Sequence, residues 1–230
     1  MSWRRAVIVG ASGGIGSALA AALADRGVEV HALTRASAKL PVDLTSESSI
    51  AAAAAQVGEE GPVDLVIVAA GLLHAPDLGP EKSWRDLDAG ALARYFAVNA
   101  TGPALVAKHF LPLLPRSGRS AFAALSARVG SIGDNRLGGW YGYRASKAAL
   151  NMLVKTLAIE LVRSRPEALC VALHPGTVDT PLSGPFQRNV PDEKLFSPDT
   201  SARYLLEVLD GLAPRDSGRC FDWAGKPIAP

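Results

Sequence analysis

Short apolar runs alternate with longer amphipathic stretches along the whole chain. The apolar runs cover residues 5–10, 28–34, 63–70, 119–126 and 168–173, with weaker candidates at 40–43 and 218–222. Helical patterns lie between them, at residues 14–26, 46–57, 86–113, 141–164 and 199–211. Runs such as 65–70 are apolar at every position, as expected for strands that helices cover on both faces. The alternation predicts an α/β fold with a doubly wound parallel sheet flanked by helices on both faces.

The chain shows no internal repeat and no linker-like segment. Its 230 residues are enough to bury one full core, so we expect a single domain over residues 1–230. The one long irregular stretch, 175–198, is rich in proline and glycine. We interpret it as a functional loop rather than a domain boundary.

Composition narrows the classes of function. With 48% hydrophobic and 20% charged residues, the chain differs from a disordered protein. Its 24 basic and 22 acidic residues are scattered, so the net charge of +2 forms no stripe for nucleic acid. No stretch approaches the ~20 apolar residues of a membrane span. We expect no signal peptide, no membrane partner and a cytoplasmic location. Cys170 and Cys220 have no metal-ligand spacing, and we predict no metal site.

A glycine-rich turn joins the first apolar run to the first helical pattern. It reads Gly10-Ala11-Ser12-Gly13-Gly14-Ile15-Gly16. Glycines allow the backbone to approach a phosphate closely, and the helix N-terminus supplies free N–H groups and positive potential. We interpret the turn as the phosphate loop of a dinucleotide site, although its spacing differs from the common Gly-x-Gly-x-x-Gly fingerprint. The alternative is an ordinary strand–helix turn.

The end of the second apolar run bears on the choice of dinucleotide. NAD sites usually have an acidic residue there, which binds the adenosine ribose 2′-hydroxyl. This chain has Thr34 followed by Arg35. A carboxylate would repel a 2′-phosphate, whereas an arginine can pair with one. The position favours NADP, with NAD as the alternative cofactor; Arg35 could otherwise be an ordinary solvated residue.

The helical pattern at 141–164 carries Tyr143 and Lys147. The two residues are four apart, so their side chains share one helix face. A tyrosine with a pKa of ~10 is a poor base at neutral pH, but a nearby ammonium favours the phenolate and lowers that pKa. Tyr143 could therefore exchange a proton with a substrate oxygen while hydride moves. Such a pair is usually an ordinary surface pair, but its place in this strand–helix pattern favours catalysis.

Three stretches carry a likeness to a known family: Ser126–Gly133, Tyr143–Asn151 and Asp216–Asp222. With them, essentially the whole chain resembles the short-chain dehydrogenase/reductase family, and within it the C-factor group, which includes insect carbonyl reductases of the sniffer type. The resemblance implies a Rossmann-type fold and an NADP-dependent oxidoreductase. Its reaction would interconvert a carbonyl and an alcohol on a small, mostly apolar molecule.

The resemblance also assigns cofactor contacts. Asp43, followed by Leu44, matches the acid that hydrogen-bonds the adenine. Ala69-Ala70-Gly71 stands where the family usually has Asn-Ala-Gly, so the backbone contact is kept without the Asn side chain. The run Pro175-Gly176-Thr177-Val178-Asp179-Thr180 matches the loop that meets the carboxamide through the Val178 backbone and the pyrophosphate through the Thr180 hydroxyl. Lys147 would also hold the nicotinamide ribose hydroxyls.

Further roles follow from the same resemblance. Asn99 matches the helix asparagine that anchors a proton-relay water beside the lysine; alternatively, it only bridges backbone groups at a helix kink. His174 is interpreted as structural. Residues 181–198 would form a mobile substrate lid. The lid and the segment before the catalytic helix would give the substrate an apolar lining of Leu137, Trp140, Leu182, Phe186, Val190 and Phe196.

One position departs from the family pattern. Family members have a serine at the end of the preceding strand, which polarises the substrate carbonyl. Alignment on Gly130 puts Ala127 in that place, and the loop to Tyr143 is longer than usual. Ser126 and Ser131 flank the gap, and both are candidates. Ser126 ranks slightly ahead because it lies at the end of the predicted strand.

Two classes of function follow. The leading hypothesis is an NADP-dependent carbonyl reductase or alcohol dehydrogenase. The alternative is a dinucleotide-binding signalling or regulatory protein of C-factor type, with little or no turnover. Tyr143, Lys147 and Asn99 together favour the enzyme, because a binding module needs none of them. Family dimers pair the helices that correspond to 86–113 and 141–164, so we expect a homodimer or homotetramer.

Overall fold

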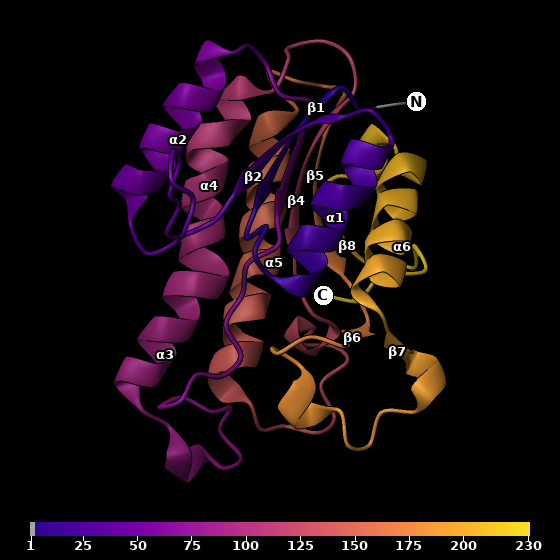
Figure 1. Ribbon diagram of the computed structural model, residues 1–230. Helices are drawn as coiled ribbons and strands as arrows, with labels where there is room; N and C mark the ends of the chain where they lie inside the picture. The colour runs from indigo at the N-terminus through magenta and orange to yellow at the C-terminus, as the bar shows by residue number, and fades with distance from the viewer. Residues whose placement is uncertain (1–2) are drawn as a thin grey trace.

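The computed structural model describes residues 3–230 (Figure 1). Its centre is a six-stranded parallel sheet in the order β2-β1-β3-β4-β5-β8. The strands are β1 (Arg5–Val9), β2 (Glu29–Leu33), β3 (Leu65–Val68), β4 (Ser120–Leu125), β5 (Ala168–His174) and β8 (Cys220–Asp222). The order changes direction between β1 and β3, where doubly wound sheets bind ligands at the carboxyl ends of their strands. The predicted fold class is confirmed.

Helices cover both faces of the sheet (Figure 1). On one face lie α1 (Gly14–Asp25) and α6 (Pro198–Gly211); on the other lie α2 (Glu47–Glu59), α4 (Gly102–Phe110) and α5 (Tyr141–Leu161). Strand β1 shows why its run is apolar throughout. Val7 and Val9 join the core under α2, α4 and α5, whereas Ala6 and Ile8 join the core under α1 and α6. Successive strand residues thus serve two cores.

The predicted helix at 86–113 consists of several elements. The 3-10 helix η1 (Trp84–Asp86) comes first, and α3 (Ala89–Phe96) begins later than predicted because the Asp88 side chain caps it at the N–H of Ala91. The π-helical turn η2 (Ala97–Thr101) connects α3 to α4, and the 3-10 helix η3 (Leu111–Leu113) ends the run. A π-turn adds a residue to one helical turn, and here it contains Asn99.

The two weak strand candidates have different outcomes. Residues 220–222 form β8, but the prediction of a strand at 40–43 is wrong. Pro41 has no N–H for a strand ladder, and the segment makes only an isolated bridge between Thr34 and Pro41. The N–H of Val42 donates to the Thr34 carbonyl at 3.0 Å. This segment therefore lies beside the end of β2 without extending the sheet.

The irregular stretch predicted as a functional loop has a short framework of its own. Strands β6 (Thr177–Val178) and β7 (Leu195–Phe196) pair in parallel and hold the two ends of the loop together. Between them lie the 3-10 helices η5 (Gly184–Phe186) and η6 (Asp192–Lys194). Two more 3-10 helices, η4 (Arg128–Gly130) and η7 (Pro214–Asp216), follow β4 and α6. Within residues 3–230, every helix is too short or too polar to cross a membrane.

Candidate active site

Tyr143 and Lys147 lie on the first turns of α5, where their side chains share a face. Both are buried, with 8% and 3% of their surface exposed. The Tyr143 ring meets the rings of Tyr95 and Trp140 edge-on, at centroid distances of 6.4 and 6.2 Å. Lys147 Nζ donates to the Leu125 carbonyl at 2.8 Å and lies 5.8 Å from the centre of the Tyr143 ring. The structure therefore brings the two residues of the proposed pair together at the end of β4.

Burial shifts the pKa of both side chains toward the neutral form. It raises the pKa of Tyr143 to about 12, with a smaller contribution from Tyr95, and it lowers the pKa of Lys147 to about 8. The expectation that the ammonium lowers the tyrosine pKa does not hold for the protein's own groups. Lys147 Nζ is directed to a backbone carbonyl, and burial of the phenol is the main cause of the raised pKa of Tyr143. Tyr143 is thus held protonated, as a proton donor must be.

The start of α5 is fixed by residues that the sequence analysis did not single out. Buried Glu81 accepts the Gly142 N–H with both carboxylate oxygens, at 3.2 and 3.1 Å. A Cβ at Gly142 would lie 2.4 Å from the Tyr95 ring, so only glycine fits there. Trp140, just before the helix, has a left-handed backbone with φ of 53°. No sequence signal identifies Glu81, because its partner is 61 residues away.

Asn99 occupies the π-turn and bonds to the loop after β3. Its Oδ1 accepts the Leu72 N–H and its Nδ2 donates to the Leu72 carbonyl, both at 2.8 Å. Nδ2 also donates to the Ser146 hydroxyl at 3.1 Å. The side-chain amide therefore bridges backbone groups at a helix irregularity, the alternative role foreseen for it. Its place beside Lys147 is also as expected, because a Cβ at Gly71 would lie 3.5 Å from Asn99 Oδ1 and 3.7 Å from Lys147 Nζ.

The two candidate serines differ in position. Ser126 follows β4 and lines a cavity together with Ala127 and Tyr143, but its buried hydroxyl donates to Asn151 Oδ1 at 2.7 Å. Ser131 is not among the residues that line this cavity. Its hydroxyl donates to the Pro230 carbonyl at 3.3 Å and accepts the Asp134 N–H at 3.0 Å. Both hydroxyls thus have protein partners, and Ser126 is the nearer of the two to the candidate site.

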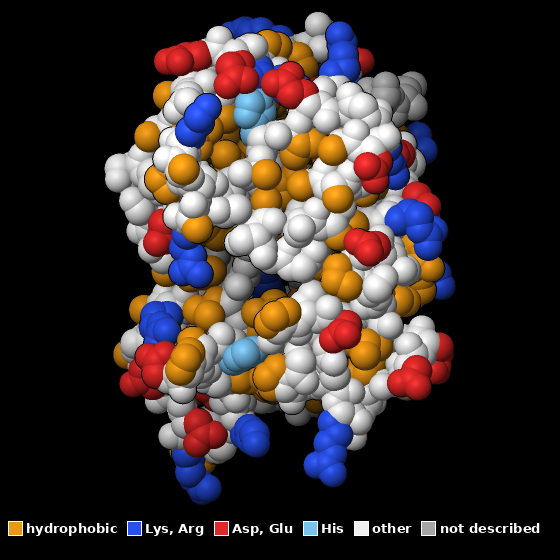
Figure 2. Space-filling view, viewed as in Figure 1, with side chains coloured by type: hydrophobic (Ala, Val, Ile, Leu, Met, Phe, Trp, Pro, Cys, Tyr) orange, Lys and Arg blue, Asp and Glu red, His pale blue; other side chains and the backbone are white. Residues whose placement is uncertain are grey.

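The cavity has a volume of about 450 Å³ and lies at the carboxyl ends of the strands. Figure 2 shows the surface hollowed near the middle of this face, with hydrophobic side chains gathered below the hollow. Five of the six predicted apolar residues line the cavity, and Phe196 does not; the five are Leu137, Trp140, Leu182, Phe186 and Val190. The Trp140 and Phe186 rings lie 5.0 Å apart, so the lid contacts the segment before α5. Tyr143 therefore faces a largely apolar cavity.

His174 also lines the cavity, at the end of β5. Its Nδ1 is buried and has no hydrogen-bond partner within residues 3–230. Burial, with Arg128 nearby, lowers the pKa of His174 to about 4, while Asp222 opposes the shift. The imidazole is therefore neutral at pH 7, and the structural role of His174 stays a prediction.

The glycine-rich turn has the shape that a phosphate cradle requires. A Cβ at Gly16 would lie 2.2 Å from the Gly10 carbonyl oxygen, and one at Gly10 would lie 2.7 Å from the Ala70 nitrogen. Helix α1 begins after Gly13 without a side-chain cap, so its first N–H groups have no intrahelical acceptor. A Cβ at Gly14 would meet Thr180 Cγ2 at 2.8 Å. The loop 175–180 therefore lies against the turn, beside the free N–H groups at the start of α1, where an anion could bind.

Two further predicted cofactor residues lie near the end of β2. Arg35 is exposed and forms no ion pair with the described residues. Asp43 Oδ1 accepts the N–H and the hydroxyl of Thr45, which lowers the pKa of Asp43. Arg35 adds a weaker contribution of the same sign, so the two side chains are close. Leu44 packs against Gly102 of α4, where an added Cβ would lie 2.6 Å from Leu44 Cβ.

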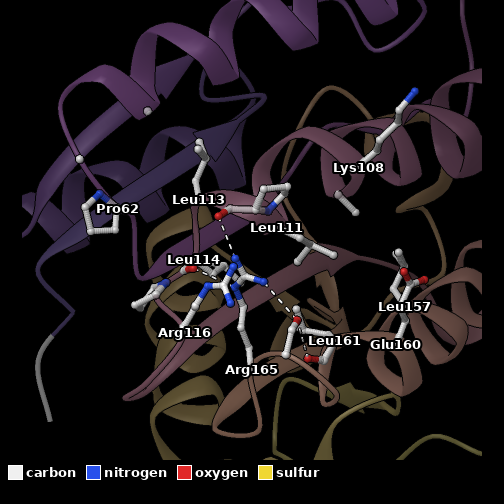
Figure 3. Close-up of a pocket in the computed structure, with 16 residues that line it drawn as sticks. Pro62, Lys108, Leu111, Leu113, Leu114, Arg116, Leu157, Glu160, Leu161 and Arg165 are labelled. Atoms are coloured by element: carbon white, nitrogen blue, oxygen red, sulfur yellow. Dashed lines mark hydrogen bonds between the residues drawn. The ribbon is translucent and has the colours of Figure 1, made fainter.

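A larger cavity lies elsewhere. It measures about 930 Å³, and its lining includes Pro62, Arg116 and Arg165, which precede β3, β4 and β5 (Figure 3). At its centre, Arg165 donates to the carbonyls of Leu114 and Pro112, both at 2.8 Å. Its lining contains no pair resembling Tyr143 and Lys147 and no glycine-rich turn before a helix. The smaller cavity is therefore the candidate active site.

A cluster of metal-ligand type also lies at the amino ends of the strands. Ligand atoms of Glu29, His31 and Glu60 lie within 4.8 Å of one another. The Arg5 guanidinium occupies the middle of this cluster, with Nε 3.1 Å from His31 Nε2 and Nη2 2.7 Å from Glu60 Oε2. Its positive charge fills the place that a metal ion would take, so the cluster is an ion-pair network.

Comparisons with known proteins agree with this geometry. The sequence profile of the family described as short chain dehydrogenase matches residues 4–191, which include the glycine-rich turn, Tyr143 and Lys147. The C-signal of Myxococcus xanthus is 41% identical over 169 residues, covering 73% of this chain and 93% of that protein. The 1-hydroxy-2-glutathionyl-2-methyl-3-butene dehydrogenase of Rhodococcus sp. strain AD45 is 34% identical over 224 residues, or 93% of each chain. The NADPH-bound carbonyl reductase from chicken fatty liver has a TM-score of 0.86 at 28% identity, over 100% of both chains.

Proposed function

Because the chain belongs to the short chain dehydrogenase family, as its sequence predicted, we propose that it is an NADP-dependent oxidoreductase that interconverts a carbonyl and an alcohol on a small, mostly apolar substrate. One observation carries the proposal. Tyr143 and Lys147 are buried side by side on α5, and Tyr143 lines a cavity that is also lined by residues of the loop from Pro175 to Thr180.

The chemistry assigned to the chain's own residues is proton transfer and positioning. NADPH bound in the glycine cradle would supply hydride to the carbonyl carbon. Tyr143 gives its proton to the carbonyl oxygen, and the product is an alcohol. Lys147, whose pKa is lowered to about 8 by burial, holds the nicotinamide ribose hydroxyls and helps to return a proton to the tyrosine. The apolar lining excludes water, which strengthens the hydrogen bond from Tyr143 to the carbonyl oxygen and the contact between Lys147 and the ribose hydroxyls.

NADP is proposed over NAD because of the end of β2. Arg35 is an exposed cation there without an ion pair among residues 3–230, and Thr34 stands in the position where an acid would repel a 2′-phosphate. The Thr34 and Ser37 hydroxyls lie 3.1 Å from each other and offer further donors to a phosphate. The chicken carbonyl reductase with similar structure binds NADPH, which supports the same choice.

The test is consumption of NADPH with a panel of small aldehydes and ketones, using wild type and Tyr143→Phe. The variant keeps the ring packing but loses the proton donor, so kcat should fall by roughly 10²–10⁴. The dissociation constant for NADPH should change little. Retention of most activity by Tyr143→Phe would remove Tyr143 from the proposed chemistry.

A second candidate function has support of its own. The Myxococcus xanthus relative is a C-signal, and Ala127 stands where the family's carbonyl-polarising serine is expected. A signalling or regulatory protein would bind NADPH with little or no turnover. The same assay separates the two functions, because this candidate requires tight NADPH binding without consumption on any substrate.

We also propose a homo-oligomer that pairs through α5. Met152 and Ile159 of this helix and Val162 directly after it are large apolar residues with 66%, 53% and 52% of their surface exposed. Burial of such side chains against a second copy would be favourable. Light scattering gives the mass in solution, and a monomer at all concentrations would contradict this proposal.

A further inference from the structure

The cavity beside Tyr143 contains more charge than an apolar substrate needs. Its charged lining residues are Arg128, Asp134, Arg136 and Arg144. Three of the four are arginines, and all come from the segment between β4 and the first turn of α5. Their ion pairs decide which of these charges a ligand can use.

Arg128 is neutralised within the fold. Its Nη1 lies 3.0 Å from Asp134 Oδ2 and its Nη2 lies 3.1 Å from Asp222 Oδ2. Asp222 also accepts the backbone N–H groups of Ala224 and Lys226. Asp134, the carboxylate among the lining residues, is therefore already paired with Arg128. The charge of Arg128 is in turn neutralised by Asp134 and Asp222, so Arg128 is not available to a ligand.

Arg144 and Arg136 form no ion pair with residues 3–230. Half-buried Arg144 donates from Nε to the Gly139 carbonyl at 3.0 Å and from Nη1 to the Val129 carbonyl at 3.3 Å. Arg136 donates from Nη1 to two carbonyls of its own loop, at 2.9 and 3.2 Å. These carbonyls hold the guanidinium groups in place without neutralising them. The Nη2 group of Arg144 makes no hydrogen bond within residues 3–230, so it is available to an anion.

We propose that the natural substrate carries a carboxylate that Arg144 binds, with Arg136 adding to the positive potential. The inference rests on the proposed function and names the class of its substrate: an oxo acid or a hydroxy acid with an apolar body. Tyr143 and Arg144 both lie at the start of α5, and both line the cavity. A short substrate can therefore place its carbonyl at Tyr143 and its carboxylate at Arg144, with its apolar part against Trp140 and Phe186.

The test uses two probes of equal size, 4-oxocyclohexanecarboxylate and its neutral analogue 4-oxocyclohexanecarboxamide. Each is assayed with NADPH for kcat and KM. Wild type should prefer the carboxylate by about ten- to a hundredfold in kcat/KM, the usual effect of one charge-assisted contact. High salt should weaken the preference for the carboxylate. It should reduce the contribution of exposed Arg136 more than that of half-buried Arg144.

Three variants assign the effect. Arg144→Gln should reduce the preference for the carboxylate probe at least tenfold. The main cause should be a higher KM for the carboxylate, while KM for the carboxamide stays constant. Arg136→Gln, on an exposed loop, should lose a smaller part. Arg116→Gln removes the same charge at the opposite end of the sheet and should leave the preference intact. Equal kcat/KM of wild type on both probes would overturn the proposal. An equal loss of kcat/KM on both probes in Arg144→Gln would also overturn it. Arg144 would then only stabilise the segment before α5 through its bonds to the Gly139 and Val129 carbonyls.

A binding experiment separates this inference from the proposed function. Calorimetry on the protein with NADPH compares cyclohexanecarboxylate with cyclohexanecarboxamide, neither of which can be reduced. Selective binding of the carboxylate that disappears in Arg144→Gln supports the anion site even if turnover is absent. Turnover of neutral carbonyls without selective binding supports the enzyme and overturns the anion site. A weaker affinity of Arg144→Gln for NADPH alone also overturns it, because Arg144 would then serve the cofactor.

Discussion

At the scale of single residues, the protein holds a cation in its interior at a cost to stability. Lys147 is buried, and its pKa is lowered from 10.5 to about 8. At neutral pH it still carries a charge, balanced by one hydrogen bond to the Leu125 carbonyl rather than by a carboxylate. A buried charge without a counter-ion destabilises the folded state. The residue is therefore retained for function rather than for stability.

Lys147→Met should stabilise the protein while inactivating it. At pH 7 we expect the free energy of unfolding to rise by about 2 kcal/mol, the desolvation relieved less the lost hydrogen bond. Between the folded pKa of about 8 and the unfolded value of 10.5, the unfolded chain binds more protons, so wild type gains stability as pH rises. The gap between variant and wild type should therefore narrow above pH 8. Urea unfolding at several pH values measures it, and a less stable variant at pH 7 would contradict this account.

The missing serine is also a question for single residues. A reacting carbonyl oxygen needs a second donor besides Tyr143, and loss of such a donor commonly lowers the rate about 10²–10³-fold. Ser126 lines the cavity but donates to Asn151, so it would have to rotate toward the substrate. Ser131 is held by the Pro230 carbonyl and lies outside the lining.

We therefore expect Ser126→Ala to lower kcat at least tenfold with NADPH affinity unchanged, and Ser131→Ala to have a smaller effect. Single-turnover kinetics with a fixed carbonyl substrate measures both variants. If neither variant loses activity, neither serine polarises the oxygen, and water or a backbone group must do so.

At the scale of elements, the catalytic helix depends on a contact from a distant segment. Glu81 caps α5 at Gly142, one residue before Tyr143, and three consecutive residues before the helix have positive φ: Gly138, Gly139 and Trp140. The helix spacing of Tyr143 and Lys147 was readable in the sequence because it is local. The capping by Glu81 was not, since it depends on how the segment after β3 folds back onto α5. The same limit applies to the tyrosine pKa, because its direction follows from burial that only the fold provides.

Glu81→Gln should weaken this start of α5. The amide can still accept one N–H but no longer brings a negative charge to the helix N-terminus, and such contacts contribute about 0.5–2 kcal/mol. We expect a loss of stability of that size and a several-fold lower kcat, because Tyr143 becomes less well positioned. Urea unfolding and steady-state kinetics measure the two effects, with Glu160→Gln at the exposed end of the same helix as control. Loss of stability at full kcat would show that Glu81 does not position Tyr143.

At the scale of the whole molecule, the sheet brings together segments that are far apart in the sequence. The turn after β1, the loop after β5 and the start of α5 meet at the carboxyl ends of the strands. The apolar runs predicted this arrangement because residues such as Val7 and Ile8 must be buried on opposite faces. The prediction of a strand at 40–43 was wrong because it rested on the apolar residues of the segment and ignored that Pro41 has no N–H to donate to a neighbouring strand. The sequence also could not predict which arginines of the cavity are available to a ligand, because this depends on the ion pairs that form in the folded protein.

The whole-molecule prediction concerns stability in the presence of cofactor. A ligand that binds only the folded chain stabilises it by RT ln(1 + [L]/Kd), about 2.7 kcal/mol at a hundred times Kd. The cradle consists of the turn after β1 and the loop after β5, so bound NADPH contacts two distant parts of the chain. It should therefore raise the free energy of unfolding of the whole molecule. NADH at the same concentration should give at least 1.5 kcal/mol less, about the value of one charge-assisted contact with the 2′-phosphate. In Arg35→Ala the two cofactors should become nearly equivalent. Thermal unfolding with NADPH or NADH at matched concentrations measures this difference, and equal stabilisation of wild type by both cofactors would contradict the NADP assignment.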